Sequence, residues 1–233
     1  MEKYCFISGA SRGVGYEIAK FMASKGYNLV LQARTIDNLN NIVEEIKKYN
    51  VKYILRSCNL EDIDSINCML KTINVDVDIV FNNAGIQIGY AKDFLNADYN
   101  TFMPQFMVNT IAPTFITYHF LKKMKEGYII NVTSGINHEP EQPAYSGSKA
   151  ALDKITNDLA FRYKDSGITI SLADPGWCRT DLGGKNAPND VKSVIPGIVL
   201  GAFSKDAHGK TIHAQDFANL TFEDALKKLK GYQ

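Results

Sequence analysis

The sequence predicts an α/β fold, a Rossmann-like doubly wound parallel sheet of about seven strands with helices on both faces. Three observations carry this prediction. Strand-like and helix-like stretches alternate along the chain, a glycine-rich turn follows the first strand, and several strands are continuous apolar runs such as Ile79–Phe81. Apolar runs without alternation are typical of strands covered on both faces, as in a parallel sheet.

The first half of the chain supplies the first three strands and helices. The run YCFI predicts a buried strand near 3–8, and the amphipathic stretch after the glycine turn predicts a helix near 13–25. Strands near 28–33 and 51–57 alternate with helices near 36–49 and 62–73. Asp62 is interpreted as the N-cap of the last of these helices.

The second half continues the alternation. Apolar runs predict strands near 78–82 and 127–133, and further strands are expected near 168–174 and 209–213. Helices are expected near 98–125, 145–165 and 190–203, the first of them broken near Thr110. Thr221 is expected to cap a short terminal helix that ends near Gly231.

Length and composition favour one domain over residues 1–233. The chain has 233 residues, of which 45% are hydrophobic, and contains no linker, charge block or internal repeat that would mark a boundary. The 26 basic and 25 acidic residues leave a net charge of +1, which gives no support for a nucleic-acid or anionic-membrane partner.

The cellular compartment is inferred from the membrane spans, targeting segments and cysteine pairs that the sequence lacks. No apolar run approaches the length of a membrane span, and the first strand begins so near Met1 that we expect no signal or transit peptide. The four cysteines form no C-x-x-C pair and are expected to be reduced thiols. The histidines show no metal-ligand spacing, so no metal site is expected. A cytoplasmic protein is the resulting expectation.

The glycine turn is the first candidate binding feature. Gly9, Gly13 and Gly15 follow the first strand and open the first helix. A strand, a glycine turn and a helix N-terminus aim backbone N–H groups at a pyrophosphate. The spacing differs from the usual G-x-G-x-x-G fingerprint, and glycines that only close a tight turn are the alternative. Dinucleotide binding is the favoured interpretation.

The pair Tyr145 and Lys149 is the candidate catalytic feature. The two residues are four positions apart on a predicted helix, so they share one face. A unit charge at ~4 Å in an effective dielectric of ~20 is worth about 4 kcal/mol. The ammonium is therefore expected to lower the pKa of the phenol from near ~10, by up to roughly 3, which would make it a proton donor and acceptor near neutral pH. An ordinary surface pair on a helix is the alternative.

These features occur in an order that resembles a known family. The glycine turn is followed by Asn82–Gly85 after the fourth strand, then by Asn109, Ser134, Tyr145 and Lys149, and lastly by the stretch Pro175–Thr180. The chain resembles the short-chain dehydrogenase/reductase family, of the compact kind with one Rossmann-like domain. The stretch from Pro175 onward is most similar to members called carbonyl-reductase-like or C-factor-like.

The resemblance implies a catalytic set of Asn109, Ser134, Tyr145 and Lys149. Tyr145 would donate a proton to the substrate carbonyl, and Ser134 would hydrogen-bond the same oxygen. Lys149 would stabilise the phenolate and bind the nicotinamide ribose, and Asn109 would hold a helix kink and a water. Thr133 is the alternative to Ser134. The segment between Ser134 and Tyr145 is shorter than in many members, which would reshape the substrate pocket.

The resemblance also implies that NADP(H) is the cofactor. No acid follows the second strand, where an NAD ribose would need one, and Arg34 stands there with Arg12 in the glycine turn. Asn59 replaces the aspartate that usually contacts the adenine. The implied cofactor-binding residues are Gly9, Ser11, Arg12, Gly13, Val14, Gly15, Arg34, Thr35, Asn59, Leu60, Asn83, Ala84, Gly85, Tyr145, Lys149, Pro175, Gly176 and Thr180.

The substrate site is expected beside Tyr145, under a lid near 182–203 that combines a loop and a helix. Trp177 is interpreted either as a pocket residue or as a packing residue. Gln87, Ile88, Tyr90 and His138 are further candidates for the pocket wall. The sequence does not select one substrate.

The resulting hypothesis is an NADPH-dependent oxidoreductase that reduces a small ketone or aldehyde to an alcohol, or catalyses the reverse. One alternative uses the same site for epimerisation, dehydration or deoxysugar chemistry in polysaccharide biosynthesis. Another is a regulatory protein that binds NADP(H) without turnover. The resemblance further implies a homodimer or homotetramer formed through the long helices around Thr110–Lys125 and Tyr145–Asp165.

Overall fold

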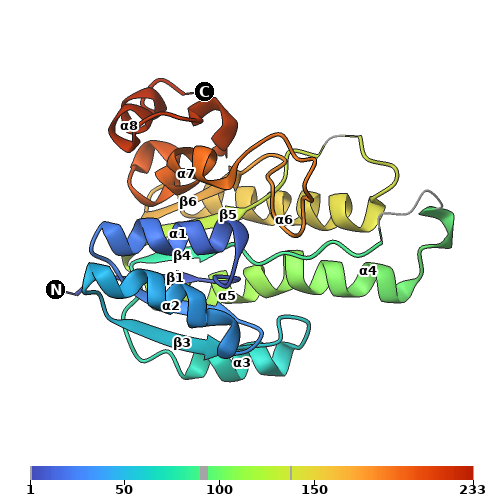
Figure 1. Ribbon diagram of the computed structural model, residues 1–233, viewed down its shortest axis with the longest axis horizontal. Coiled ribbons are helices and arrows are strands. Elements are labelled where there is room, and N and C mark those ends of the chain that lie inside the picture. Colours follow the sequence, from blue (N-terminus) through green and yellow to red (C-terminus); the bar gives the residue numbers. More distant parts are fainter. Residues whose placement is uncertain (1, 90–93, 137, 233) are drawn as a thin grey trace.

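The computed structural model describes residues 2–89, 94–136 and 138–232 and contains one seven-stranded parallel sheet. The strands lie in the order β3-β2-β1-β4-β5-β6-β7 (Figure 1). The order reverses direction between β1 and β4, which is the doubly wound arrangement. This confirms the predicted fold class. The strands are β1 (Tyr4–Ile7), β2 (Asn28–Ala33), β3 (Tyr53–Ser57), β4 (Ile79–Asn82), β5 (Glu126–Val132), β6 (Gly167–Asp174) and β7 (Thr211–His213).

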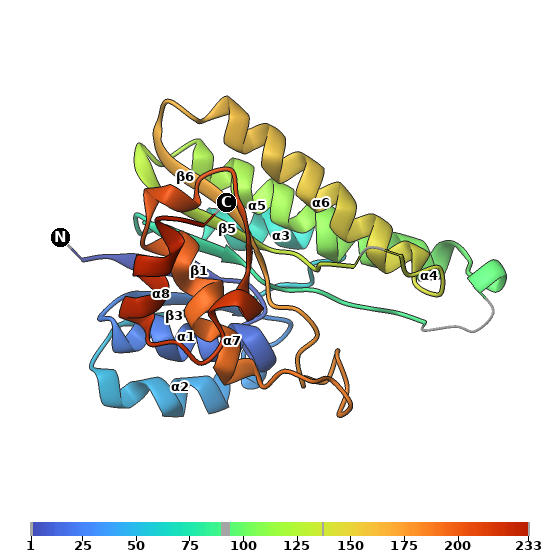
Figure 2. The same ribbon diagram turned by 90° about the horizontal axis from the view of Figure 1, so that it is seen from above.

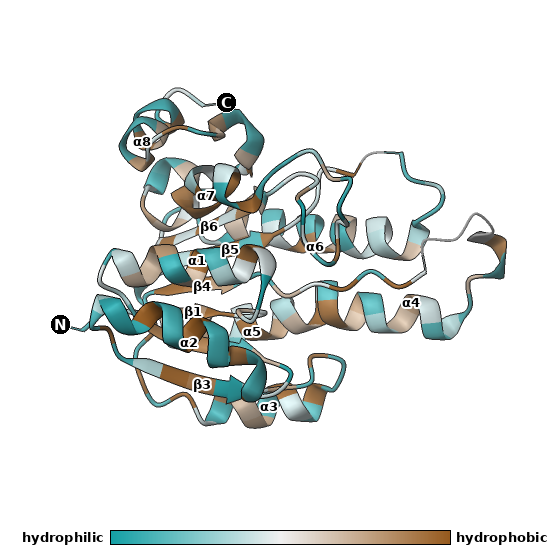
Figure 3. Ribbon diagram, viewed as in Figure 1, coloured by the Kyte–Doolittle hydropathy of each residue, from teal (hydrophilic) through white to brown (hydrophobic). Residues whose placement is uncertain are grey.

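One face of the sheet is covered by α1 (Gly13–Ser24), α2 (Asn40–Ile46) and α7 (Val191–Val199). Their buried side chains form a core with alternate residues of the strands, such as Cys5 and Ile7 of β1. Side chains alternate between the faces of a strand, so every second residue of a parallel strand belongs to this core. Figure 3 shows hydrophobic residues on the strands and hydrophilic residues on the outer side of α2.

The other face is covered by α3 (Ile63–Lys71), α5 (Ala112–Leu121) and α6 (Pro143–Arg162). Their core takes the remaining residues of the strands, including Tyr4 and Phe6 of β1. The C-terminal helix α8 (Phe222–Leu229) closes a third, smaller core beside β7. The sheet is thus buried on both faces, which explains why its strands are continuous apolar runs.

The predicted elements are all present, with small changes at their ends. The long helix expected near 98–125 consists of α4 (Tyr99–Phe106), a π-helical turn (Met107–Ile111) and α5, so the break expected near Thr110 is confirmed. Asp62 and Thr221 cap α3 and α8 as predicted, each accepting a hydrogen bond from the first turn. The sequence pattern did not reveal the short 3₁₀ turns at Lys205–Ala207 and Ala214–Phe217.

Within the described ranges, no helix is both long and apolar enough to cross a membrane. The four cysteines are free thiols, as expected.

Candidate active site

The residues singled out by the sequence gather where the strands end. Figures 1 and 2 show α4 and α6 extending past the sheet on the side to which the strands point. In a doubly wound sheet this edge is where ligands bind. The glycine turn follows β1, Asn83 to Gly85 follow β4, Ser134 follows β5 and Pro175 follows β6. The topology therefore brings these segments, distant in sequence, to one place.

Tyr145 and Lys149 lie in the first two turns of α6, which begins at Pro143. Proline suits the first helical positions because it has no N–H to leave unpaired and its φ is already helical. Both side chains are buried, with exposed fractions of 8% for Tyr145 and 4% for Lys149. The Lys149 Nζ donates a hydrogen bond of 2.8 Å to the Val132 carbonyl at the end of β5. This bond anchors α6 to the sheet directly below the site.

Ser134 and Thr133 have different partners, and this separates the two candidates. The Ser134 hydroxyl lies close enough to the Tyr145 hydroxyl to oppose the rise in its pKa. Thr133 is buried, and its hydroxyl donates instead to the Asp153 carboxylate of α6. Ser134 is therefore the hydroxyl beside the phenol, whereas Thr133 is held away from it.

The expectation that the Lys149 ammonium lowers the pKa of the Tyr145 phenol is wrong. Burial raises the pKa of Tyr145 above 10.0; the Ser134 hydroxyl opposes this, and the negative charge of Asp174 adds to it. Burial excludes water from the phenolate, and the Lys149 ammonium is directed at the Val132 carbonyl rather than at the phenol. Spacing on a helix could not reveal either effect.

Lys149 is perturbed in the opposite direction. Burial lowers the pKa of Lys149 from 10.5 to about 8, although the charges of Asp153 and Asp174 work against this. A buried ammonium loses hydration, so the neutral amine is favoured. At neutral pH the site therefore holds a protonated phenol beside an ammonium that is close to losing its proton.

Asn109 lies within the π-helical turn and is fully buried. Its side chain accepts a hydrogen bond from the Ile86 N–H and donates one to the Ile86 carbonyl, both 2.9 Å long. It also donates to the Ser148 hydroxyl at 3.0 Å. The widened turn aims the amide at the loop after β4, and π turns often mark functional sites. Asn109 thus ties the helix kink to the segment that carries Gly85.

The glycine turn is a close-packed cradle. Gly9 has φ +66°, and a Cβ there would lie 2.8 Å from the Ala84 Cα. A Cβ on Gly15 would lie 2.2 Å from the Gly9 carbonyl oxygen. Neither position tolerates a side chain, because backbone occupies the space. The turn therefore needs glycine at both positions, because it packs directly on the segment after β4 and on its own backbone.

The segment after β4 is fastened to the glycine turn. The Asn83 side chain donates to the carbonyls of Ser8 and Gly9 at 3.0 and 3.2 Å. The Ser8 hydroxyl accepts from the backbone N–H groups of Asn83 and Ala84. Gly85 lies beside the catalytic candidates, since a Cβ there would be 3.5 Å from the Lys149 Nζ.

The N-terminus of α1 meets the segment after β6. A Cβ on Gly13 would lie 3.2 Å from the Thr180 Cγ2. Arg12, the N-cap of α1, makes no side-chain cap, and its guanidinium lies 3.3 Å from the Asp181 carboxylate in an exposed ion pair. Gly176 follows Pro175, has φ +66° and donates its N–H to Asp174 at 2.9 Å. Ser11 and Val14 are half-buried members of the same turn.

The residues expected near the adenosine are at the other end of the cradle. Arg34 and Thr35 directly follow β2 and are exposed. The Arg34 guanidinium has no ion pair or hydrogen bond with any described residue. Asn59 is exposed and its side-chain oxygen accepts from the Glu61 N–H at 3.2 Å, while its neighbour Leu60 is buried.

These residues fit a nicotinamide dinucleotide. Orphan N–H groups in the first turn of α1 suit a pyrophosphate, since Arg12 does not cap them and the first turn contains no acid. Gly13 lies against Thr180, and Gly85 lies against Asn109 and Lys149. Across the described ranges, no group of three or more acidic, histidine or cysteine side chains is placed to hold a metal ion.

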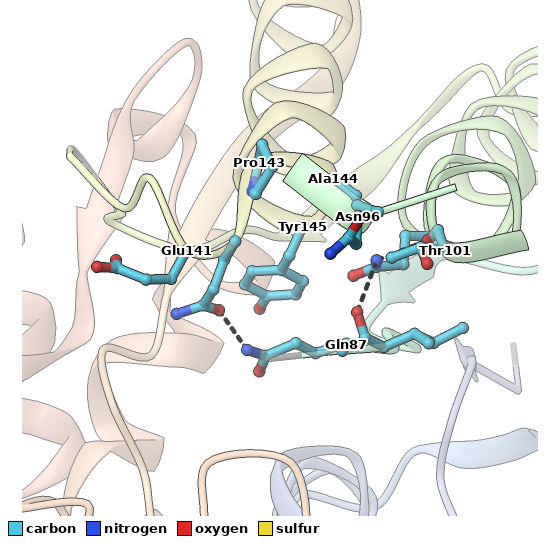
Figure 4. Close-up of a pocket in the computed structure, with 12 residues that line it drawn as sticks. Gln87, Asn96, Thr101, Glu141, Pro143, Ala144 and Tyr145 are labelled. Carbon is cyan, nitrogen blue, oxygen red and sulfur yellow. Dashed lines mark hydrogen bonds between the residues drawn. The ribbon is translucent and has the colours of Figure 1, made fainter. Parts of the chain in front are cut away.

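A cavity of about 150 Å³ opens beside Tyr145 (Figure 4). Its walls include Gln87 and Ile88 from the loop after β4, Gln105 from α4 and Gln142 at the start of α6. Gln87 and Gln142 hydrogen-bond each other across it. Gln87 and Ile88 were expected here, whereas His138 does not line the cavity and Tyr90 lies outside the described residues.

Trp177 takes neither of its expected roles. The side chain is 57% exposed and does not line this cavity, and its ring N–H donates to the Gly183 carbonyl at 2.6 Å.

The segment expected to form a lid consists of two different parts. Residues 179–190 form a largely exposed loop, whereas α7 contributes Val194 and Ile198 to the main core. Only the loop remains a candidate for the predicted lid.

Four positioning residues were missed by the sequence analysis. Ser8 directly follows β1, and Asp174 is the last residue of β6. A position at the end of a strand was the signal used for other site residues, but it was not applied to these two. Gln32 stands inside the apolar strand β2, which was a usable signal; it accepts from the Gly9 N–H and donates to the Cys58 carbonyl, both at 3.0 Å. Asp153 carried no signal, because a carboxylate one turn after Lys149 is expected on any helix surface.

Comparison with known proteins gives one family. Residues 3–191 match the family model of the short chain dehydrogenases. A curated relative, the 3-oxoacyl-[acyl-carrier-protein] reductase FabG of Rickettsia conorii, is 27% identical over 226 residues, which cover 93% of this chain and 91% of the relative.

Solved structures share the fold. A metagenomic short-chain oxidoreductase in complex with NADP superimposes with a TM-score of 0.79 at 23% identity, covering 91% of this chain and 96% of the other. The 3-oxoacyl-[acyl-carrier protein] reductase from Brucella melitensis in complex with NAD superimposes with a TM-score of 0.82 at 22% identity, covering 92% and 96%.

Proposed function

Because the chain belongs to the short-chain dehydrogenase family, we propose that it is an NADPH-dependent oxidoreductase that reduces a small ketone or aldehyde to an alcohol, or catalyses the reverse. The observation that supports this best is the convergence of Ser134, Tyr145 and Lys149 beside the glycine cradle. A protein that only bound the cofactor would not need a buried phenol with a hydroxyl partner.

The chain's own residues supply the proton and hold the carbonyl. Tyr145 donates its proton to the carbonyl oxygen, which gains negative charge during reduction. Ser134, which lies beside the phenol, directs its hydroxyl to the same oxygen and stabilises that charge. A bound nicotinamide supplies the hydride. The Lys149 ammonium, which points at the Val132 carbonyl in the resting protein, turns to the phenolate left behind and stabilises it. Asn109 keeps the loop after β4 in place.

The preference for NADPH over NADH rests on two arginines. Arg34 is exposed at the end of β2, where a 2′-phosphate would lie, and no acid occupies the strand end. Arg12 pairs only with the exposed Asp181, and such an ion pair is weak enough to exchange for a phosphate. Among the structural relatives, one is in complex with NADP and another with NAD, so the argument depends on these side chains.

The substrate is proposed to be small. The cavity beside Tyr145 encloses about 150 Å³. Pockets for drug-sized ligands are usually about 300 Å³ or larger. A compact ketone or aldehyde matches this space better than a long acyl chain.

The function is tested with a panel of small ketones and aldehydes, following the loss of NADPH absorbance and identifying the products. We expect alcohols to form with at least one member of the panel. Tight NADPH binding without turnover on any member would support the regulatory alternative. Products of unchanged oxidation state would support epimerisation or dehydration.

The cofactor preference is tested by Arg34→Glu. We expect NADPH to bind roughly ten- to a hundredfold more weakly, because a charge-assisted hydrogen bond of about 1.5–3 kcal/mol is lost. The affinity for NADH should stay within about threefold. Arg162→Glu, an exposed arginine at the far end of α6, is the matched control. Equal affinity of the unmodified protein for both cofactors would contradict the proposal.

A further inference from the structure

Two carboxylates at the base of the site have no part in the mechanism above. Asp174 ends β6 and is buried, with an exposed fraction of 6%. Asp153 lies one helical turn after Lys149 on α6 and is partly buried. Both charges favour the Lys149 ammonium, Asp153 more strongly than Asp174. Without these two charges, burial would lower the pKa of Lys149 further, and a larger fraction of the lysine would be neutral.

The same two carboxylates hold the segment that carries Ser134. On one side of it, the Thr133 hydroxyl donates to the Asp153 carboxylate. On the other side, Gly135 packs so closely on Asp174 that a Cβ would lie 2.4 Å from Oδ2. Ser134 is therefore fixed between two residues, each of which is seated on a carboxylate.

Asp174 is itself held in place. Its Oδ1 accepts the Gly176 N–H at 2.9 Å, and its Oδ2 lies 3.0 Å from the His213 Nδ1 at the end of β7. The His213 side chain is about half exposed, so it links the buried carboxylate to the surface. A buried carboxylate with partners on both oxygens is a rigid element rather than a mobile side chain.

We propose that Asp153 and Asp174 are positioning residues of the reaction: together they seat the Ser134 turn and keep Lys149 cationic inside the protein. This inference rests on the proposed function of Ser134 and Lys149. Neither carboxylate contacts the reacting atoms. Their effect passes through the hydroxyl that stabilises the carbonyl oxygen and through the ammonium that stabilises the phenolate.

Ionisable groups from several packed elements surround Asp153 and Asp174. The ionisable groups whose charges act with that of Asp174 are Tyr145, Lys149 and Asp153 of α6, Cys178 after β6, His213 of β7 and Tyr232 near the C-terminus. Lys149 is the one group of this set, apart from the half-exposed histidine, that can carry a positive charge. The charges of both carboxylates thus act on one buried ammonium, against the effect of burial.

The charge part is tested by titrating Lys149 in the cofactor-free protein. Lysine labelled with ¹³C at Cε is followed by NMR, and the Lys149 signal is assigned by its loss in Lys149→Met. We expect a midpoint near pH 8 in the unmodified protein. Asp153→Asn and Asp174→Asn should each lower it by about half a pH unit or more, and the double substitution should lower it further.

The positioning part is tested by Thr133→Val and Gly135→Ala. The first removes the hydroxyl that binds Asp153, and the second forces a methyl group against Asp174. Neither substitution removes a carboxylate or its charge. We expect kcat for carbonyl reduction to fall roughly tenfold, with the NADPH affinity within about twofold. The Lys149 midpoint should remain near that of the unmodified protein.

Asp158→Asn is the matched control, because Asp158 is an exposed carboxylate of the same helix that pairs with Lys154. It should change neither the midpoint nor kcat. A Lys149 midpoint that is unchanged in the double substitution would overturn the charge part, and unchanged kcat in both positioning variants would overturn the seating part. Because the titration needs no turnover, its result stands even if no carbonyl substrate is reduced. Should Asp174→Asn fail to fold, Asp153→Asn alone carries the same test.

Discussion

At the scale of single residues, burial decides the chemistry of the site. It raises the pKa of Tyr145 and lowers that of Lys149, so each group is pushed towards its neutral form. A phenol that keeps its proton is suited to donate it to a carbonyl oxygen that has gained charge. The ammonium is needed at the next moment, when the phenolate remains. The resting protonation state of Tyr145 is therefore the one that the proposed carbonyl reduction requires.

Replacing Tyr145 with Phe removes the proposed proton donor and leaves the ring in place. We expect carbonyl reduction to fall by about 10²–10⁴-fold, the usual contribution of a general acid. The NADPH affinity, measured by fluorescence titration, should change by less than about twofold. Tyr163→Phe, at the other end of the same helix, is the control. Turnover that is unaffected by Tyr145→Phe would remove this residue from the mechanism.

The lowered pKa of Lys149 leads to a second prediction, on how the free energy of unfolding depends on pH. Its folded-state pKa of about 8 lies below the ordinary 10.5. Below pH 8 the lysine is protonated in both states, and above it the unfolded chain binds more protons. The free energy of unfolding should therefore rise with pH above about 8, by at most about 1.4 kcal/mol per pH unit.

The measurement is the urea unfolding of the cofactor-free protein between pH 7.5 and 9, read as the difference from Lys149→Met. The difference is needed because burial raises the pKa of Cys5, Cys58 and Cys178, whose ionisation in the unfolded chain lowers stability above pH 9. A slope that is the same with and without Lys149 would contradict the lowered pKa.

The residue scale is also where sequence reasoning was least complete. The spacing of Tyr145 and Lys149 correctly placed both on one helix, and the position after β5 correctly brought Ser134 near them. The direction of the phenol pKa was predicted wrongly. It depends on burial and on Asp174, a residue distant in sequence whose proximity only the sheet order creates.

At the scale of elements, the π-helical turn between α4 and α5 is the feature that shapes the site. One extra residue in the turn rotates Asn109 towards the loop after β4, where its amide satisfies both backbone groups of Ile86. The sequence predicted a break here, and the alternation of strand-like and helix-like stretches predicted every strand. It could not predict the π geometry, because that depends on the partner that the amide finds.

Asn109→Ala tests how much this turn depends on its amide. Three buried hydrogen bonds are lost and the two Ile86 groups are left unpaired, so we expect unfolding to become easier by about 2–3 kcal/mol. Asn100→Ala, on the exposed side of α4, should change stability by less than about 0.5 kcal/mol. Urea denaturation measures both. Similar stabilities for the two variants would show that the π turn does not depend on Asn109.

At the scale of the whole molecule, the outer helices leave aromatic side chains in solvent. Phe115 and Tyr118 are exposed on α5, with ring centroids 6.3 Å apart, and Phe161 on α6 is 74% exposed. Single exposed aromatics are ordinary, but several on two helices that both flank the same face of the sheet are typical of an interface. We predict that a second copy of the chain covers them.

Light scattering on a size-exclusion column tests this prediction. The unmodified protein is expected to elute at a multiple of its 26.0 kDa mass, as a dimer or tetramer. Phe115→Glu combined with Phe161→Glu should shift it to the monomer, because burying an unpaired carboxylate in an apolar contact is costly. Leu95→Glu is the control, since Leu95 is 81% exposed in the short turn before α4 and belongs to neither α5 nor α6. A monomeric unmodified protein at micromolar concentration would contradict the prediction. A multimer that survives both charges would place the interface on another surface.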